Sequence, residues 1–194
     1  MSLRIIGGRF RNRLLKTPKG DKTRPTLAIM RKAVFDMLQF SLPDASFLDL
    51  FAGSGIMGIE ALSRGAAHAT FVDKDRHALS CIKDNLELLQ LTDQADILAC
   101  DAKVALQQCA KKKLTYDIIY IDPPYKLSQT TPLLTELLHF IDTHQLLNPE
   151  GTLLVEETTP ASLNHFSSPH LRFIDSRQFS DSILHQFRRI NFFK

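Results

Sequence analysis

The residues whose types and spacing point most directly to chemistry are Asp122-Pro123-Pro124-Tyr125. They follow a short apolar run, 117–121, that is typical of a buried strand, and ligands bind at the carboxyl ends of such strands in open α/β sheets. Each proline favours an extended conformation in the residue before it and removes one backbone N–H. The turn therefore offers carbonyl oxygens and the Asp122 carboxylate as acceptors, without competing donors at 123 and 124. Such a cluster suits an amino group held in the plane of a nucleic-acid base.

An exocyclic amine is a weak nucleophile because its lone pair is delocalised into the ring. Hydrogen bonds from its N–H groups to the Asp122 carboxylate and the Pro123 carbonyl would orient the nitrogen for attack on a methyl group that a cofactor supplies. Tyr125 could stack on an extruded base, a contact worth about 1–3 kcal/mol. A rigid turn without a catalytic role is the alternative, but the position after a buried strand and downstream of a glycine loop favours catalysis.

A glycine-rich segment, Gly53-Ser54-Gly55-Ile56-Met57-Gly58, follows another predicted strand and opens a helical pattern. Its first two glycines permit backbone conformations and a close ligand approach that a Cβ would block, and the third permits close packing of helix on sheet. Asp73 ends the next predicted strand and could accept hydrogen bonds from ribose hydroxyls. The spacing fits a dinucleotide loop as well as an S-adenosylmethionine loop, so the glycines alone do not decide between them.

Two further acids favour S-adenosylmethionine. Asp49 stands just before the loop, where it would repel a pyrophosphate but attract the ammonium and sulfonium groups of S-adenosylmethionine. Asp101 follows the third predicted strand and is placed to accept from an adenine amino group. Glu156-Glu157, at the end of another predicted strand, could also border the site.

The first 24 residues form a basic arm. They hold eight Lys and Arg residues against a single Asp, whereas the remaining chain holds sixteen bases and twenty acids. A mildly acidic body with a strongly basic arm indicates a polyanionic partner, nucleic acid above all. A solvated tail without a partner is the alternative that charge alone leaves open.

The elements that would position these residues alternate between short apolar runs and amphipathic stretches. A helix begins at Pro25. The predicted strands cover 46–51, 69–72, 96–99, 117–121 and 152–156, and the predicted helices cover 56–64, 76–90, 102–111 and 129–145. This alternation predicts parallel βαβ units. The segments 172–175 and 183–193 predict a final antiparallel hairpin, which completes a one-domain α/β fold.

The composition sets limits on the class of protein. With 194 residues, 44% hydrophobic and 23% charged, the chain is expected to be one domain, 1–194, with a core at 25–194. No apolar run reaches the roughly 20 residues that span a bilayer, and no secretory signal is visible, so a cytoplasmic location is expected. The three cysteines lack C-x-x-C spacing and the seven histidines are scattered, which predicts neither a disulfide framework nor a metal site.

Beyond the glycine loop and Asp122-Pro123-Pro124-Tyr125, three segments make a family resemblance specific: Arg4-Ile5-Ile6-Gly7-Gly8, Arg24-Pro25-Thr26 and Glu60-Ala61-Leu62-Ser63-Arg64-Gly65. The chain resembles the bacterial RsmD-type methyltransferases, which methylate N2 of one guanine, at position 966, in 16S ribosomal RNA. The resemblance implies a class I methyltransferase fold: a Rossmann-like seven-stranded sheet, mostly parallel, with its last strand antiparallel.

The resemblance also implies site residues. S-adenosylmethionine would contact Asp49, Phe51, Ala52, Gly53, Ser54, Gly55, Asp73, Lys74, Asp101, Ala102 and Asp122. Catalysis would lie at Asp122, Pro123, Pro124 and Tyr125. RNA phosphates would contact Arg4, Arg9, Arg11, Arg13 and Arg24. The expected partner is 16S ribosomal RNA within the small subunit or a late assembly intermediate, and the enzyme is expected to act as a monomer.

One segment departs from the family pattern. After Arg-Pro-Thr the family continues with Thr-Asp-Arg-Val-Arg-Glu, whereas this chain has Leu27-Ala28-Ile29-Met30-Arg31-Lys32. Any contact of that helix with cofactor or RNA would differ here.

Two other functions remain as alternatives to guanine-N2 methylation. One is an adenine-N6 methyltransferase of DNA or RNA, which is disfavoured because no target-recognition domain is visible. The other is a catalytically silent RNA-binding assembly factor. An NAD-dependent oxidoreductase has no use for the Asp122 turn.

Overall fold

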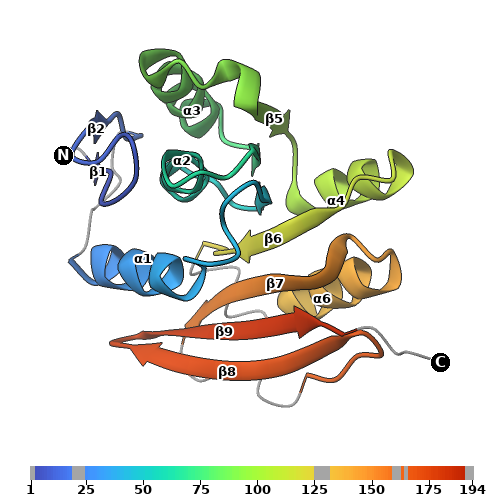
Figure 1. The fold of residues 1–194 in the computed structure, drawn as a ribbon. Helices are drawn as coiled ribbons and strands as arrows, with labels where there is room; N and C mark the ends of the chain where they lie inside the picture. Colours follow the sequence, from blue (N-terminus) through green and yellow to red (C-terminus); the bar gives the residue numbers. More distant parts are fainter. Residues whose placement is uncertain (1–2, 19–24, 125–131, 159–162, 164–165, 191–194) are drawn as a thin grey trace. The chain divides into compact units, whose positions relative to one another are not determined.

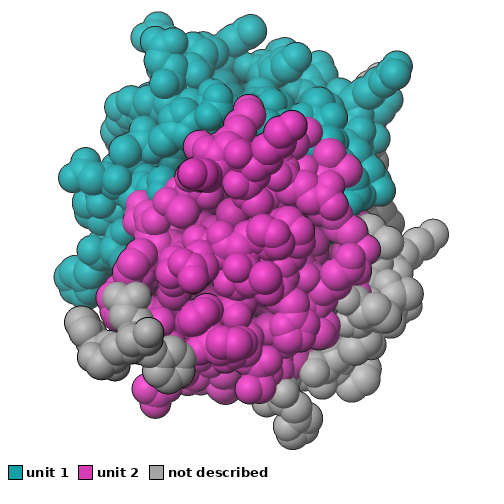
Figure 2. Space-filling model, turned by 90° about the vertical axis from the view of Figure 1, so that its right-hand side faces the viewer, with its two compact units in different colours: residues 1–101 teal, residues 102–194 magenta. Residues whose placement is uncertain are grey.

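The computed structural model describes residues 3–18, 25–124, 132–158, 163 and 166–190. The chain divides into two compact units, residues 1–101 and residues 102–194 (Figure 2). Each unit carries its own strands and helices.

The first unit holds three parallel strands in the order β5-β4-β3, labelled in Figure 1. The strands are β3 (Ser46–Asp49), β4 (His68–Asp73) and β5 (Ala95–Ala99), and the helices are α1 (Pro25–Met37), α2 (Ile56–Ser63) and α3 (Arg76–Leu89), with the short 3-10 helix η1 at Thr92–Gln94. The apolar residues of β3 and β4, such as Phe47 and Phe71, are fully buried. Because the strands are parallel, Asp49 and Asp73 end at the same edge of the sheet.

A separate two-stranded antiparallel pair, β1 (Leu3–Arg4) and β2 (Leu14–Leu15), lies beside α2 in Figure 1. The pairing of these two strands closes the residues between them into a loop within the described part of the basic arm, residues 3–18. Ile5 and Leu15 bury their side chains completely or nearly so, which fixes the arm by apolar burial as well as by hydrogen bonds.

The second unit holds four strands in the order β6-β7-β9-β8. The strands are β6 (Tyr116–Ile121), β7 (Leu147–Thr158), β8 (Leu171–Phe179) and β9 (Ser182–Arg189), and the helices are α4 (Ala102–Lys111) and α6 (Pro132–Thr143). β6 and β7 are parallel, whereas β9 is antiparallel to both β7 and β8.

The fold class predicted from the sequence is confirmed. Three strands in the first unit and four in the second make seven, mostly parallel, with the expected antiparallel hairpin at β8–β9. Element boundaries differ in places. The strand predicted at 46–51 ends at Asp49, because Leu50 and Phe51 already turn into the glycine loop. In the hairpin, β8 is longer than the predicted 172–175, whereas β9 begins at Ser182 and ends at Arg189, before the predicted end at 193. Within the described part of the chain, no helix is long and apolar enough to cross a membrane.

Candidate active site

The glycine loop connects β3 to α2 and depends on two left-handed residues. Gly53 has φ +54° and Gly55 has φ +78°, a region that residues with a Cβ rarely adopt. A Cβ at Gly53 would meet no atom within 4 Å, so the space beside this residue is open. At Gly58 the opposite holds, since a Cβ would lie 2.3 Å from the Phe71 ring. Gly58 therefore allows α2 to pack closely against β4, as its spacing in the sequence predicts.

Backbone N–H groups of this loop donate to acceptors within the protein. The N–H of Gly53 donates to the Asp73 carboxylate at 2.8 Å, that of Gly55 to the Ala52 carbonyl at 2.7 Å, and that of Ala52 to the Val72 carbonyl at 2.9 Å. A loop that binds pyrophosphate needs such N–H groups free to donate to phosphate oxygens. These three are engaged, which favours a cofactor without phosphates at this position.

Asp49 is a buried acid below the loop, with a residue exposure of 1%. Burial raises the pKa of its carboxyl to about 7, the nearby Asp73 charge adds to the shift, and a hydrogen bond from the Gly58 N–H at 3.3 Å opposes it. An ionised Asp49 is costly without a compensating positive charge. The group is thus suited to meet a cationic part of a ligand.

Asp73 is held in place by its own hydrogen bonds. One carboxylate oxygen accepts from the Gly53 N–H at 2.8 Å and the other from the Asp75 N–H at 2.9 Å. A carboxylate has about four lone-pair positions, so Asp73 keeps acceptor capacity for ligand hydroxyls. Nearby, Lys74 and Asp101 form an exposed ion pair at 3.4 Å, which stabilises the fold little.

The remaining cofactor candidates differ in their exposure. Phe51 is half-buried, and Ala52 and Ser54 are buried. The Ser54 carbonyl accepts from Asn85 Nδ2 at 3.2 Å. Ala102 begins α4 in the second unit and is buried.

The second unit carries the candidate catalytic turn at the end of β6. Asp122 is half-buried, Pro123 is buried and Pro124 is exposed, while Tyr125 lies outside the described residues. Ile121 pairs with Val155 of the parallel strand β7, so Asp122 and Glu156 stand at the same end of the two strands. The two acids are therefore neighbours, and Asp122 affects the ionisation of Glu156, lowering its pKa.

Glu156 also accepts a hydrogen bond from a tyrosine hydroxyl. Tyr120 donates to Glu156 Oε1 at 2.5 Å, and both side chains are buried. Burial raises the pKa of Glu156, against the opposing effects of Tyr120 and Asp122. The sequence marks Glu156 only as a strand-end acid, and it gives no sign of Tyr120, because the pairing depends on β6 and β7 being neighbours.

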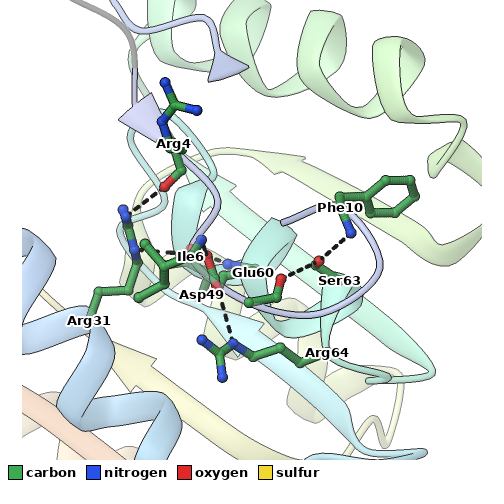
Figure 3. Close-up of polar contacts among 10 residues, drawn as sticks. Arg4, Ile6, Phe10, Arg31, Asp49, Glu60, Ser63 and Arg64 are labelled. Carbon is green, nitrogen blue, oxygen red and sulfur yellow. Dashed lines mark hydrogen bonds and ion pairs between the residues drawn. The ribbon is translucent and has the colours of Figure 1, made fainter. Parts of the chain in front are cut away.

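The basic arm is anchored to α2 by hydrogen bonds (Figure 3). The Ile6 N–H donates to Glu60 Oε2 at 2.8 Å, and the Phe10 N–H donates to Ser63 Oγ at 3.0 Å. The Ser63 hydroxyl in turn donates to the Gly7 carbonyl at 2.7 Å. At Gly8, with φ +72°, a Cβ would lie 1.9 Å from the Ser63 carbonyl oxygen. The glycine pair therefore lets the arm backbone lie directly on the end of α2.

Glu60 lies completely buried between two arginines. Its carboxylate is 2.8 Å from Arg64 Nε and 3.9 Å from Arg31 Nε. Arg31 Nη2 also donates to the Arg4 carbonyl at 2.8 Å, as Figure 3 shows. Arg31, which lies in the helix segment that departs from the family pattern, therefore holds the arm. The sequence patterns did not predict this role.

A second anchor connects the arm with the glycine loop. The fully buried Asn85 of α3 accepts from the Lys16 N–H at 2.8 Å and donates to the Lys16 carbonyl at 3.0 Å. The same Asn85 amide donates to the Ser54 carbonyl. One side chain therefore links the arm to the loop between β3 and α2.

The arm's arginine side chains lie on the surface. Arg4, Arg9, Arg11 and Arg13 are exposed, and Arg24 lies outside the described residues. Arg9 donates to Gln94 Oε1 at 2.7 Å and lies 4.8 Å from the centre of the Phe10 ring. Their exposure leaves these guanidinium groups accessible to a polyanion.

Comparisons with known proteins agree across most of the chain. The family model described as "Conserved hypothetical protein 95" matches residues 3–188. The chain is 40% identical to Bacillus subtilis YlbH, over 83% of this chain and 85% of that protein. It is 36% identical to "Ribosomal RNA small subunit methyltransferase D" of Escherichia coli K12, over 79% of this chain and 74% of that protein. The solved structure of Escherichia coli yhhF matches with a TM-score of 0.84 and 29% identity, over 98% of this chain and 99% of that one.

Proposed function

Because the chain belongs to the family of the bacterial RsmD-type ribosomal RNA methyltransferases, we propose that it methylates N2 of one guanine in 16S ribosomal RNA with S-adenosylmethionine. The observation that carries the proposal is the position of the Asp122 carboxyl at the end of β6, directly before two prolines and beside the end of the parallel strand β7. We treat residues 25–194 as one catalytic domain bearing the arm, since the family model spans both units.

We assign S-adenosylmethionine to the β3–α2 loop and the acids beside it. Three observations support the fit: the engaged loop N–H groups, the open space beside Gly53 and the buried acid Asp49. Asp73 would accept from ribose hydroxyls, and Asp101 from the adenine amino group. The full set of proposed contacts is Asp49, Phe51, Ala52, Gly53, Ser54, Gly55, Asp73, Lys74, Asp101, Ala102 and Asp122. When bound, the cofactor supplies a methyl group activated by its sulfonium.

At the catalytic turn, the residues of the chain orient the base. The Asp122 carboxyl and the Pro123 carbonyl accept hydrogen bonds from the two N–H groups of the amine, so its nitrogen lone pair faces the methyl group. Pro123 and Pro124 provide no backbone N–H that could compete for these acceptors. Rate enhancement then comes mainly from orientation and electrostatics.

The exposed arginines of the arm would bind RNA phosphates. We assign this role to Arg4, Arg9, Arg11, Arg13 and Arg24. Such contacts release counterions, so the affinity falls steeply with salt concentration. Because the arm is fixed to α2 rather than loose, it presents its charges at a defined place on the first unit. We propose the small ribosomal subunit or a late assembly intermediate as the physiological substrate.

The test is to incubate the protein and labelled S-adenosylmethionine with small subunits, free 16S RNA or DNA, and to map the modified nucleotide. We expect N2-methylguanine at one position. Asp122→Ala should lower the rate more than about tenfold while cofactor binding persists. Methylation of adenine N6 would instead establish the alternative target. RNA binding without any turnover by the wild-type protein would indicate an assembly factor.

A further inference from the structure

The β8–β9 hairpin of the second unit places two arginines directly opposite each other. The strand register pairs Arg172 of β8 with Arg188 of β9, and both side chains are exposed. Directly opposite residues on antiparallel strands lie on the same face of the sheet, with their Cβ atoms about 5 Å apart. Like charges in this arrangement repel each other and destabilise the sheet. The stability of the hairpin alone therefore does not favour this pair.

The protein does not neutralise the two charges. Among the described residues, no hydrogen bond or ion pair engages the guanidinium group of Arg172 or Arg188. The other two arginines of the hairpin differ. Arg177 is paired with a neighbouring aspartate at 3.2 Å, and Arg189 donates to the side-chain oxygen of Gln145 at 2.9 Å. Arg172 and Arg188 thus keep all their N–H donors for a ligand.

Protection of the sheet edge explains only one member of the pair. β8 is the outer strand of this part of the sheet, as Figure 1 shows, and charged side chains on an outer strand prevent pairing with other chains. β9 lies between β7 and β8, where Arg188 stands opposite Thr152 on one side and Arg172 on the other. A strand with two neighbours needs no such protection, so this role does not explain the exposed charge at Arg188.

The hairpin is basic, whereas the rest of the chain after the arm is acidic. Residues 171–189 hold four arginines against two aspartates. The remaining residues after position 24 hold twelve Lys and Arg against eighteen Asp and Glu. A local excess of positive charge on an acidic protein attracts a polyanion to that place.

The strand register also relates the pair to the candidate catalytic turn. Thr152, opposite Arg188, and Glu156 are four positions apart on β7, so they lie on the same sheet face, about 13 Å apart along the strand. Glu156 stands at the same end of the parallel strands as Asp122. A short RNA segment with one base at the Asp122 turn can therefore extend to the two arginines within the second unit.

We propose that Arg172 and Arg188 form a phosphate-binding pair for the RNA backbone, a second contact surface besides the basic arm. The planar guanidinium groups donate to phosphate oxygens in a forked geometry, and a phosphate between them removes their mutual repulsion. This inference rests on the proposed function, because that function supplies RNA as the polyanion.

The first experiment compares two double variants that change the net charge equally. One is Arg172→Gln with Arg188→Gln. The matched control is Lys103→Gln with Lys111→Gln, since both lysines are exposed on α4 of the same unit. The affinity for 16S RNA is measured by filter binding over a range of salt concentrations.

The arginine variant should bind RNA at least about fivefold more weakly at low salt. Its plot of log K against log salt concentration should be less steep by about 1.4, the value for two phosphate contacts with a single strand. The control should keep the wild-type slope and stay within about twofold of the wild-type affinity. An arginine variant that behaves like the control would refute the phosphate-binding pair.

Methylation kinetics separate this inference from the proposed function. The arginine variant should have a raised KM for RNA, with kcat at saturating RNA and the affinity for S-adenosylhomocysteine unchanged. If the wild type methylates RNA and the variant shows neither a raised KM nor weaker binding, the pair is refuted and the function stands. If RNA binding depends on the pair but no nucleotide is ever methylated, the proposed function fails and the pair stands.

Two controls exclude other roles for the arginines. Arg172→Lys with Arg188→Lys keeps both charges and should restore the wild-type salt slope; a slope that stays reduced would mean that altered structure caused the loss, and the inference would fail. Thermal unfolding of the glutamine variant should occur at the wild-type temperature or above, because a repulsion has been removed. Binding to phosphatidylglycerol vesicles should not distinguish the arginine variant from its control. A loss confined to vesicles would assign the pair to a lipid surface and overturn the proposal.

Discussion

Replacing Glu60 with glutamine should release the basic arm from α2 while the strands of the first unit remain folded. The Glu60 carboxylate accepts from the Ile6 N–H at 2.8 Å and lies 2.8 Å from Arg64 and 3.9 Å from Arg31. Glutamine has the same shape but no charge, and its NH₂ group would face donors. The hydrogen bond from the arm backbone would weaken, and the positive charges of Arg31 and Arg64 would lose their negative partner.

The expected magnitude follows from burial. Glu60 is fully buried and Arg31 is 5% exposed, so removal of the carboxylate leaves a buried charge with much less compensation. Breaking such a pair on one side costs about 3–5 kcal/mol, and a hydrogen bond to a charged group contributes about 1.5–3 kcal/mol of that loss. Arg64 is 21% exposed and can regain part of its hydration. We therefore expect the free energy of unfolding to fall by about 3 kcal/mol.

Two measurements check this expectation. Urea denaturation gives the change in unfolding free energy, and limited trypsin digestion reports arm release through cleavage after Arg9, Arg11 or Arg13. Cleavage in the arm should accelerate at least about tenfold, since it follows the population of the open form. Glu87→Gln, at an exposed position of α3, is the control and should change neither quantity. A loss below about 1 kcal/mol together with unchanged cleavage would show that Glu60 does not hold the arm.

Two further predictions concern ligands. Because burial raises the pKa of Asp49 to about 7, and a cationic cofactor favours its ionised form, cofactor affinity should fall as the pH decreases below 7. Binding should then release a proton, which calorimetry in buffers of different ionisation enthalpy detects; Asp49→Asn should abolish this pH dependence, and its persistence would assign the proton elsewhere. Replacing Arg9, Arg11 and Arg13 with glutamine should make the plot of log K for RNA binding against log salt concentration less steep. The decrease in slope should correspond to the loss of up to about three phosphate contacts. An identical slope would mean that these arginines do not touch phosphates.

The fold could be predicted where a strand has a continuous apolar run. β4 and β6, which are largely buried, were located within one residue because their apolar runs end at acids. The partly exposed strand β5 was also located, because Ile97-Leu98-Ala99 stands between two acids. β8 was predicted too short because most of Leu171–Phe179 is exposed, which removes the apolar alternation that marks a strand. The start of β7 was missed because Pro149 and Gly151 are typical of turns, although this segment continues the strand.

The residues of the candidate site could also be predicted only in part. Strand-end logic locates Asp49, Asp73 and Asp122, because each follows from a local pattern and a parallel sheet. The contacts of Glu60 and Glu156 could not be predicted, since they join residues that are 54 and 36 positions apart and share no motif. Such pairings depend on which strands and helices become neighbours.

The anchoring of the arm has a consequence for the time course of folding. The arm is synthesised before the side chains that hold its backbone, because Glu60, Ser63 and Asn85 lie 53 to 69 residues further along the chain. Closing such long loops costs entropy that is recovered only when the partner helix is already formed. We therefore expect the arm to make its full set of contacts only after both α2 and α3 have left the ribosome exit tunnel. Ribosome-bound chains of increasing length should become fully resistant to trypsin at the arm only after α3 has emerged.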